Sequence, residues 1–115
     1  MANDFKNAIA QNISNAAGGT TIYTTPATKT SIMLELDIAN TTNNVVEASV
    51  ELLDSSVSAS AWRYLVKNAP VPSGGSLMVI AGQKIVLEAG DKVRLTSSAA
   101  NVLDAVAAIL EDVNS

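Results

Sequence analysis

The chain of 115 residues contains no cysteine and no histidine. Without cysteine there is no disulfide, no thiolate metal ligand and no cysteine nucleophile. Without histidine, the role of general base in a hydrolase triad would fall to a Lys, Asp or Glu whose pKa is strongly shifted. The many Ser and Thr residues therefore lack their usual activator. We expect no catalytic residues, no cofactor, no metal and no enzymatic activity.

Aromatic side chains are also scarce. The full set is Phe5, Tyr23, Trp62 and Tyr64, whereas apolar residues make up 48% of the chain. Because each aromatic side chain buries roughly 150 to 250 Å², a core made mostly of Ala, Val, Leu and Ile is thin. Ordering a residue costs on the order of 1.5 kcal/mol. We therefore expect neighbouring subunits to supply part of the burial.

Basic charge is low and scattered along the chain, with seven Lys and Arg residues against eleven Asp and Glu residues and a net charge of -4. Binding to a nucleic-acid backbone needs a clustered basic face, so we expect no nucleic-acid partner. The N-terminus lacks the pattern of a signal peptide, and no run approaches the roughly 18 apolar residues of a membrane helix. These features predict synthesis in the cytoplasm and no membrane partner.

Apolar and polar residues alternate over 31–40, which is typical of a half-buried strand. The predicted inner face is Ile32, Leu34, Leu36 and Ile38, and the predicted outer face is Met33, Glu35, Asp37 and Ala39. The polar segment 40–44 predicts a hairpin loop, and 46–52 repeats the alternation as a second strand. Aromatic and β-branched residues predict a third strand over 61–67.

The prolines and glycines of 68–75 cannot continue in a central strand. Short strands are then predicted at 77–80, 84–88 and 92–96. Turns recur roughly every 8 to 12 residues, which is the spacing of a sandwich or barrel.

The last segment, 102–110, is apolar on both alternating faces. Its alanines favour a helix, whereas burial on both sides would suit a central strand, and we favour the strand. An unpaired buried carboxylate is costly, so Asp104 either faces outward or pairs with Lys92 or Arg94. We favour the outward position, and a salt bridge between subunits is a further hypothesis.

Near the N-terminus, the spacing of Phe5, Ile9 and Ile13 fits one face of a helix and also one face of a strand. Residues 1–19 therefore form either a first strand or an arm that orders on a partner. Residues 20–115 are predicted to form one domain. The expected fold is all-β, a single antiparallel β-sandwich of about eight short strands with jelly-roll or Ig-like topology.

Paired carboxylates are the remaining candidates for chemistry. Glu35 and Asp37 share one strand face, as do Glu47 and Glu51, and two carboxylates about 5 to 9 Å apart can hydrolyse a glycosidic bond. Alternation alone explains all four, so we favour a solvated face. No Asp-x-Asp-x-Asp-Gly run supports a calcium site.

Large side chains are the candidates for contacts. In a chain so poor in aromatics, Trp62 and Tyr64 are predicted to anchor the core, with an interface as the alternative. Met33, on the predicted outer face, is the better candidate for a contact surface because its thioether adapts to a partner. The candidate interface residues are Phe5, Ile9, Ile13, Tyr23, Met33, Trp62 and Tyr64.

The segment 22–30, running into 32–42, resembles a pattern of small bacteriophage virion proteins: a strand, a Pro-Ala turn, and an alternating strand that ends in Ala-Asn-Thr. The stretches 65–77 and 85–91 are similar as well. In that pattern a Gly often stands where this chain has Thr28. The resemblance implies a β-sandwich displayed in many copies on the virion and implies no catalytic residues.

By this resemblance, the chain would be a capsid decoration (cement) protein that stabilises the shell through subunit contacts, or a neck or tail component. Its partners would be other copies of itself and virion proteins such as the major capsid protein or tail and neck proteins. A carbohydrate-binding or adhesin sandwich is an alternative, which would use Tyr23 as a stacking platform. A glycosidase is a third, which would depend on Glu35 or Asp37.

Overall fold

The computed structural model describes residues 4–56 and 62–111, with only the backbone at 81–83, and the regular structure of this part is entirely β-strand. The strands are β1 (Asp4–Ala10), β2 (Thr20–Thr24), β3 (Ser31–Asn40), β4 (Val46–Leu53), β5 (Trp62–Val71), β6 (Ser76–Leu87), β7 (Lys92–Ser97) and β8 (Leu103–Glu111). The predicted all-β class is therefore confirmed. Within these ranges, no helix is present that is long and apolar enough to cross a membrane.

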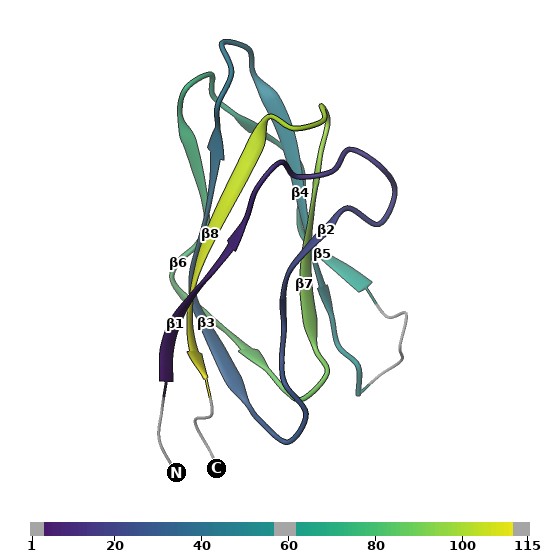
Figure 1. Ribbon diagram of the computed structural model, residues 1–115, viewed down its shortest axis with the longest axis vertical. Coiled ribbons are helices and arrows are strands. Elements are labelled where there is room, and N and C mark those ends of the chain that lie inside the picture. Colours follow the sequence, from purple (N-terminus) through teal and green to yellow (C-terminus); the bar gives the residue numbers. More distant parts are fainter. Residues whose placement is uncertain (1–3, 57–61, 112–115) are drawn as a thin grey trace.

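The strands form two four-stranded antiparallel sheets, β1-β8-β3-β6 and β2-β7-β4-β5, which face each other as a sandwich (Figure 1). Along the chain, the first strand pairs with the last, the second with the seventh, the third with the sixth and the fourth with the fifth. The chain is thus a long antiparallel ribbon that folds between β4 and β5 and is rolled up. This is the jelly-roll arrangement, and not the Ig-like alternative.

The core lies between the two sheets and is aliphatic except for Met33 and Tyr23. Its fully buried large side chains include Ile13, Leu36, Ile38, Leu87, Leu95, Leu103 and Ile109. The molecule measures only 20 Å along its shortest axis, compared with 45 Å along its longest. The thin core predicted from composition is therefore present, because one layer of mostly medium-sized side chains fills the space between the sheets.

A β-bulge in β3 reverses part of the alternation predicted for this strand. Met33 pairs with Ile109 of β8, and Glu35 pairs with the adjacent Ala108, so Leu34 is an extra residue. Met33 consequently points into the core and is fully buried. Its prediction as a contact residue is wrong, because a bulge of one residue moves every side chain before it to the other face of the sheet. After the bulge, the predicted faces are confirmed.

Two strand boundaries also differ from the prediction. The segments 77–80 and 84–88 belong to one strand, β6, because its ladder with β3 continues across register shifts. β5 continues to Val71 and includes Pro70. It can do so because β5 is at the edge of its sheet, where a missing ladder donor is tolerated.

The two terminal segments are neighbouring strands. β8 lies between β1 and β3, which confirms a strand over 103–110, and residues 4–10 form the edge strand β1. Asp104 is half-buried, and its Oδ1 accepts a hydrogen bond from the backbone N–H of Asn12 at 3.0 Å. Among the described residues no ion pair joins Asp104 to Lys92 or Arg94. The carboxylate instead ties down the turn after β1.

Candidate interaction surface

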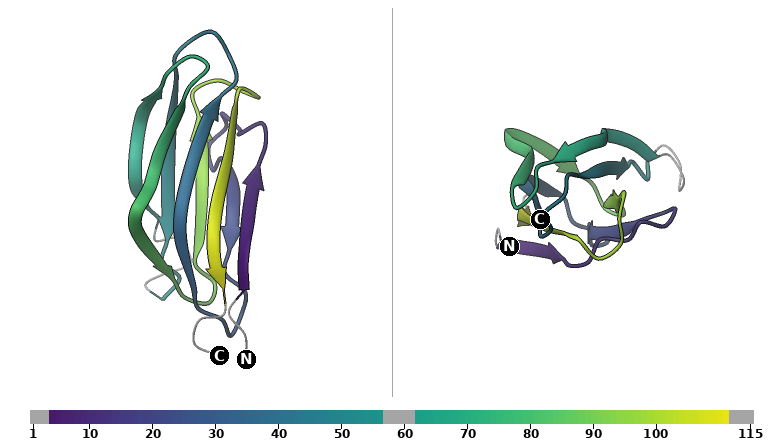
Figure 2. Two further views of the ribbon diagram at one scale, coloured as in Figure 1. Left: turned by 90° about the vertical axis from the view of Figure 1, so that its left-hand side faces the viewer. Right: turned by 90° about the horizontal axis from the view of Figure 1, so that it is seen from above.

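The outer surface of the β1-β8-β3-β6 sheet carries apolar side chains across all four strands. The strand registers align Phe5 with Leu110, Leu110 with Ile32, and Ile32 with Val86. Phe5 is 76% exposed and Val86 is 61% exposed, while the other two are half-buried. The left view of Figure 2 looks onto this sheet.

A second row crosses the same surface about four residues further along the strands. It aligns Ile9 with Val106, Val106 with Asp37, and Asp37 with Met78. Ile9, Val106 and Met78 are all exposed. We call the two rows the apolar face, which consists of Phe5, Ile9, Ile32, Met78, Val86, Val106 and Leu110.

Among residues 4–56 and 62–111, no further layer covers the apolar face. The sequence predicts that β8 is covered on both sides, yet only its inner side chains are buried, and Val106 on its outer side is 46% exposed. Four strands about 4.8 Å apart and roughly eight residues long at about 3.3 Å per residue make a flat area of roughly 500 Å². The largest apolar patch on a typical monomer covers about 300 to 600 Å² and is often functional. The apolar face, which occupies much of this area, is therefore a candidate contact surface.

Carboxylates are the main charged groups on this side of the molecule. Glu35 is exposed, Asp37 is half-buried, and alternation places Asp104 on the same side at one end. Lys84 of β6 is exposed, and its position next to the inward Ile85 places it on this side as well. Three carboxylates and one ammonium give this surface a net charge of -2.

Asp37 has an unusual environment within the apolar face. Its Oδ1 is buried and has no hydrogen-bond partner among the residues that the structure describes. A buried carboxylate oxygen without a donor is costly, and the remainder of this half-buried carboxylate carries its negative charge at the surface of the apolar face.

The outer surface of the opposite sheet has different chemistry. Arg94 of β7 donates two hydrogen bonds to Glu51, from Nε to Oε1 at 3.0 Å and from Nη2 to Oε2 at 3.2 Å. Its guanidinium also lies 3.8 Å from the centroid of the Trp62 ring. On the edge strand β5, the Lys67 ammonium lies 5.2 Å from the centroid of the Tyr64 ring. Both contacts are cation-π interactions.

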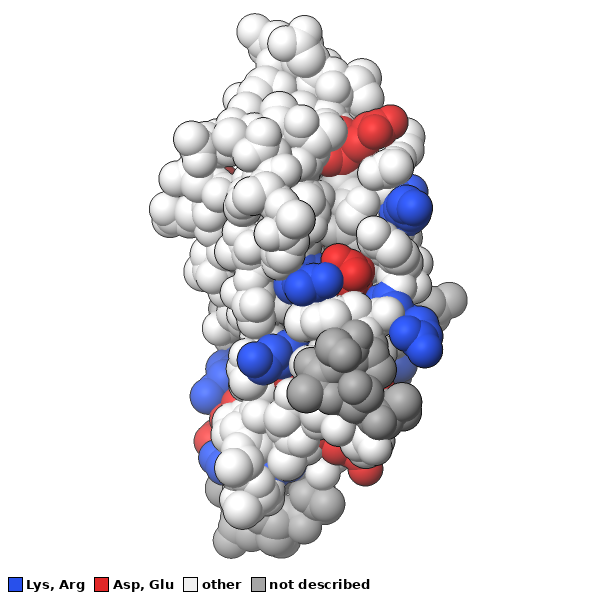
Figure 3. Space-filling model, turned by 90° about the vertical axis from the view of Figure 1, so that its right-hand side faces the viewer, with Lys and Arg blue, Asp and Glu red and all other residues white. Residues whose placement is uncertain are grey.

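We call this surface the basic face, and it consists of Trp62, Tyr64, Lys67, Lys92 and Arg94. Its three cations exceed the two carboxylates on the same side, Glu47 and Glu51, by one charge. Arg63 is exposed on the edge strand at its rim. Figure 3 looks onto this side of the molecule, where Lys and Arg side chains surround carboxylates.

Trp62 and Tyr64 therefore lie on the outer surface and not in the core. Tyr64 is 53% exposed, and Trp62 is half-buried beside Arg94. The prediction that these two aromatics anchor the core is wrong. Bulges in the pairing of β4 with β5 leave both rings on the side of Glu51, whose carboxylate points away from the core.

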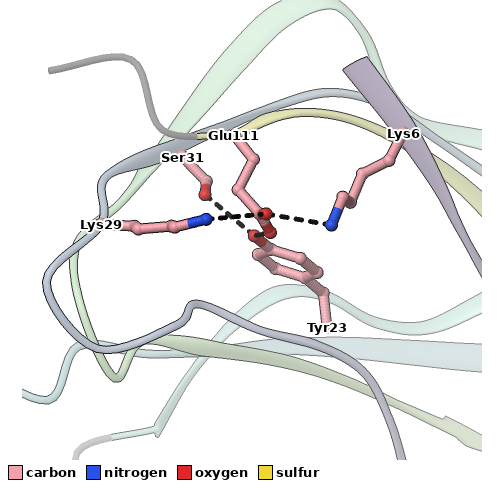
Figure 4. A network of polar contacts seen from close by, with 5 residues as sticks. All are labelled: Lys6, Tyr23, Lys29, Ser31 and Glu111. Atoms are coloured by element: carbon pink, nitrogen blue, oxygen red, sulfur yellow. Dashed lines mark hydrogen bonds and ion pairs between the residues drawn. The ribbon is translucent and has the colours of Figure 1, made fainter. Parts of the chain in front are cut away.

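A polar network joins the two sheets at one end of the sandwich (Figure 4). Glu111, the last residue of β8, is only 3% exposed. Tyr23 of β2 donates its hydroxyl proton to Glu111 at 2.5 Å, and Ser31 of β3 shares a 2.9 Å hydrogen bond with that hydroxyl. The ammonium groups of Lys6 and Lys29 lie 3.0 and 3.8 Å from Glu111 Oε1.

These contacts shift two pKa values in opposite directions. Burial, followed by the hydrogen bond to Glu111, raises the pKa of Tyr23 to about 12. The hydrogen bond from Tyr23 lowers the pKa of Glu111 below its usual value, and Lys6 and Lys29 lower it further despite burial. Glu111 is therefore an ionised carboxylate surrounded by hydrogen-bond donors, and its contacts link the two sheets at this end.

Two more predicted interface residues are buried. Tyr23 is 8% exposed because its ring fills the end of the core. Ile13 is fully buried, and its backbone N–H donates to the carbonyl of Leu103 at 2.9 Å. Both predictions of a contact surface are wrong, because the chain turns inward after β1 and because Glu111 draws the Tyr23 hydroxyl inward.

Phe5 and Ile9 are the predicted residues that reach the apolar face, and sequence reasoning did not find the rest of it. The missed members are Ile32, Met78, Val86, Val106 and Leu110. The segment 102–110 is apolar on both alternating faces, and this pattern could have indicated that Val106 and Leu110 form an apolar outer surface. Ile32 was hidden by the bulge, which reverses its expected side.

A carboxylate group on the loops has a structural explanation. Asp54, Glu88 and Asp91 bring carboxylate oxygens within 4.8 Å of one another. Asp91 Oδ1 accepts hydrogen bonds from the N–H and the hydroxyl of Ser55, and Oδ2 accepts one from the N–H of Glu88. Asp91 therefore ties the two loops together. The adjoining hollow is lined mainly by Thr, Ser and Lys side chains of the same loops.

Comparisons of the chain with protein-family models, with curated proteins and with solved structures each found no match.

Proposed function

We propose that this chain is a non-enzymatic structural component of a bacteriophage virion, a capsid decoration protein that stabilises the assembled shell through subunit contacts. The observation that carries the proposal is the apolar face, on which Phe5, Ile9, Met78 and Val86 are each more than 60% exposed. Such a surface gains free energy when a neighbouring protein covers it.

Two further properties support the proposal. Jelly rolls occur in viral capsid proteins and also in lectins and cupins, so the fold is compatible with a role in the virion without deciding it. The thin aliphatic core leaves a modest surplus of stability, which contacts with neighbours would increase. The resemblance of 22–42 to small virion proteins points to the same class.

The two alternative functions, carbohydrate binding and glycoside hydrolysis, depend on residues whose positions do not suit those roles. A carbohydrate-binding sandwich would need Tyr23 as a stacking platform, but its ring is buried and its hydroxyl is bonded to Glu111. A glycosidase would need a free carboxylate pair, but both oxygens of Glu51 are bound by Arg94. Glu35 lies beside exposed apolar residues on an open sheet surface, which offers no enclosed cleft for a sugar.

The test is binding of the purified chain to phage particles that were assembled without it. We expect saturable binding and a higher temperature of shell disruption. The variant Met78→Lys/Val86→Lys should bind at least about tenfold more weakly, because it places charge in the apolar contact. Val45→Lys is the matched control, since Val45 is 64% exposed outside the apolar face.

The distribution of bound protein identifies the location. Many copies at lattice points indicate a decoration protein, whereas one closed ring indicates the neck or tail. A monodisperse monomer that fails to bind such particles would contradict the proposal.

A further inference from the structure

We infer that copies of this chain associate face to back, so that the apolar face of one copy docks on the basic face of the next. The inference deepens the proposed function by naming a partner, a second copy of this chain, and it rests on that function. The two surfaces lie on opposite sides of the sandwich, as the left view of Figure 2 and the view of Figure 3 show.

Charge complementarity favours this arrangement. The side with the apolar face has a net charge of -2, and the side with the basic face has a net charge of +1, with Arg63 at its rim. The exposed Tyr64 and half-buried Trp62 can cover aliphatic side chains while their cations reach the carboxylates. One surface is aromatic and basic, and the other is apolar and acidic. Specific protein interfaces use this kind of complementarity in charge and polarity.

Asp37 provides a specific point of contact. Its Oδ1 is buried without a donor among the described residues and lies in the row that contains Ile9, Val106 and Met78. Lys67 is exposed on β5, the edge strand of the basic face, and makes no ion pair within the described part of the chain. An ammonium of this kind from the next copy would pair with the accessible part of this half-buried carboxylate.

A two-fold dimer through the apolar face alone fits less well. A two-fold axis would place this surface against itself, so that both sides of the contact carry the acidic net charge. Like charges in a contact are costly. In face-to-back contacts the carboxylates of the apolar side meet a side of opposite net charge, and the association continues from copy to copy into a closed ring or an open filament.

The size of the contact predicts weak pairing that repetition strengthens. A flat area of roughly 500 Å² on each copy corresponds to about 1,000 Å² in total, near the lower limit for a specific interface. Two copies in solution should therefore associate weakly. Many copies held together on a particle should associate firmly.

Mixing two blocked variants tests the inference. Met78→Lys/Val86→Lys blocks the apolar face, and Lys67→Glu/Lys92→Glu blocks the basic face. In face-to-back association each variant keeps one working surface, so each should sediment as a monomer alone, and an equimolar mixture should give a heterodimer that grows no further. All four positions lie on outer surfaces, and circular dichroism of each variant checks that it folds.

Charge reversal adds a second readout that does not depend on complete blocking. Asp37→Lys should weaken self-association by about tenfold, and adding Lys67→Glu in the same chain should recover part of that loss because the pair is restored with its charges exchanged. Wild-type chain that stays monomeric at millimolar concentration, or a mixture of the blocked variants that forms no heterodimer, would overturn the inference. Either result leaves the proposed function standing if the wild-type chain still binds the particles.

Discussion

At the scale of single residues, Tyr23 and Glu111 make a contact that joins the two sheets. They belong to different sheets and lie 88 positions apart in the sequence, yet they share a buried hydrogen bond. Lys6 and Lys29 complete the surroundings of the carboxylate. A buried ion pair adds little net stability, but removing one partner leaves the other unsatisfied. The network therefore fixes how the sheets meet at this end.

We predict that Tyr23→Phe lowers the free energy of unfolding by about 1 to 3 kcal/mol at pH 7, because Glu111 loses a buried donor. It should also change the response to alkali. Between pH 10 and about 12 the unfolded wild-type chain releases the Tyr23 proton and the folded chain keeps it, so stability falls as pH rises. The variant lacks this contribution.

The measurement is the urea midpoint between pH 3 and 12. The variant should show a smaller alkaline slope than the wild-type chain, because it lacks the contribution of Tyr23. On the acid side, the lowered pKa of Glu111 contributes stability above about pH 4.5 that is lost as pH falls, and this contribution should shrink in the variant. Tyr64→Phe, whose hydroxyl is on the surface, is the control. Equal alkaline slopes in all three proteins would contradict the assignment.

Thr28 has a backbone conformation that is uncommon for a residue other than glycine. The phage pattern often has Gly there, and the structure places Thr28 at a φ of 69°, in the left-handed region that favours glycine. The turn is closed by a hydrogen bond from the Lys29 N–H to the Pro26 carbonyl at 3.3 Å. A glycine would adopt this conformation without strain, whereas this chain has a β-branched residue there.

At the scale of elements, the sequence predicted where most strands lie, but it did not predict the bulges and the pairings between strands. Alternation and turn residues were sufficient to predict β3, β4, β7 and β8. The bulge at Leu34 has no local signal, because it depends on how β3 pairs with β8. Its effect is large, since it exchanges the sides of Ile32 and Met33. The contact of Tyr23 with Glu111 was equally hidden, because pairings between distant segments leave no periodic trace.

Deletion of single residues tests the bulge. Deleting Leu34 removes the extra residue and leaves every remaining side chain of β3 on its present side, so we predict a folded protein that loses about 1 to 2 kcal/mol. Deleting Asp37 instead forces either Leu36 or Ile38 out of the core. Exposing such side chains costs about 1.5 to 3 kcal/mol each, so this variant should be unfolded or nearly so.

Urea unfolding of both deletion variants distinguishes these outcomes. The two deletions remove one residue each from the same strand, and they differ in whether the alternation survives. Similar losses of stability in the two variants would mean that the bulge does not set the register of β3.

At the scale of the whole molecule, the fold class follows from composition and alternation, whereas the choice of jelly roll over Ig-like topology requires the long-range pairing. The rolled ribbon leaves one sheet with a surface rich in exposed aliphatic residues and the other with a surface of aromatic and basic residues. In the proposed assembly, contacts between these two surfaces would stabilise the thin sandwich.

The central claim is that the apolar face is a contact surface in the assembled particle, and site-specific photo-crosslinking tests it most directly. A photoreactive residue at Val86, in the apolar face, is compared with the same residue at Val45, which is similarly exposed outside it. On particles carrying the chain, we predict a covalent adduct to another copy or to a virion protein from position 86 and little or none from position 45. Equal adducts from both positions, or none from position 86, would contradict the account.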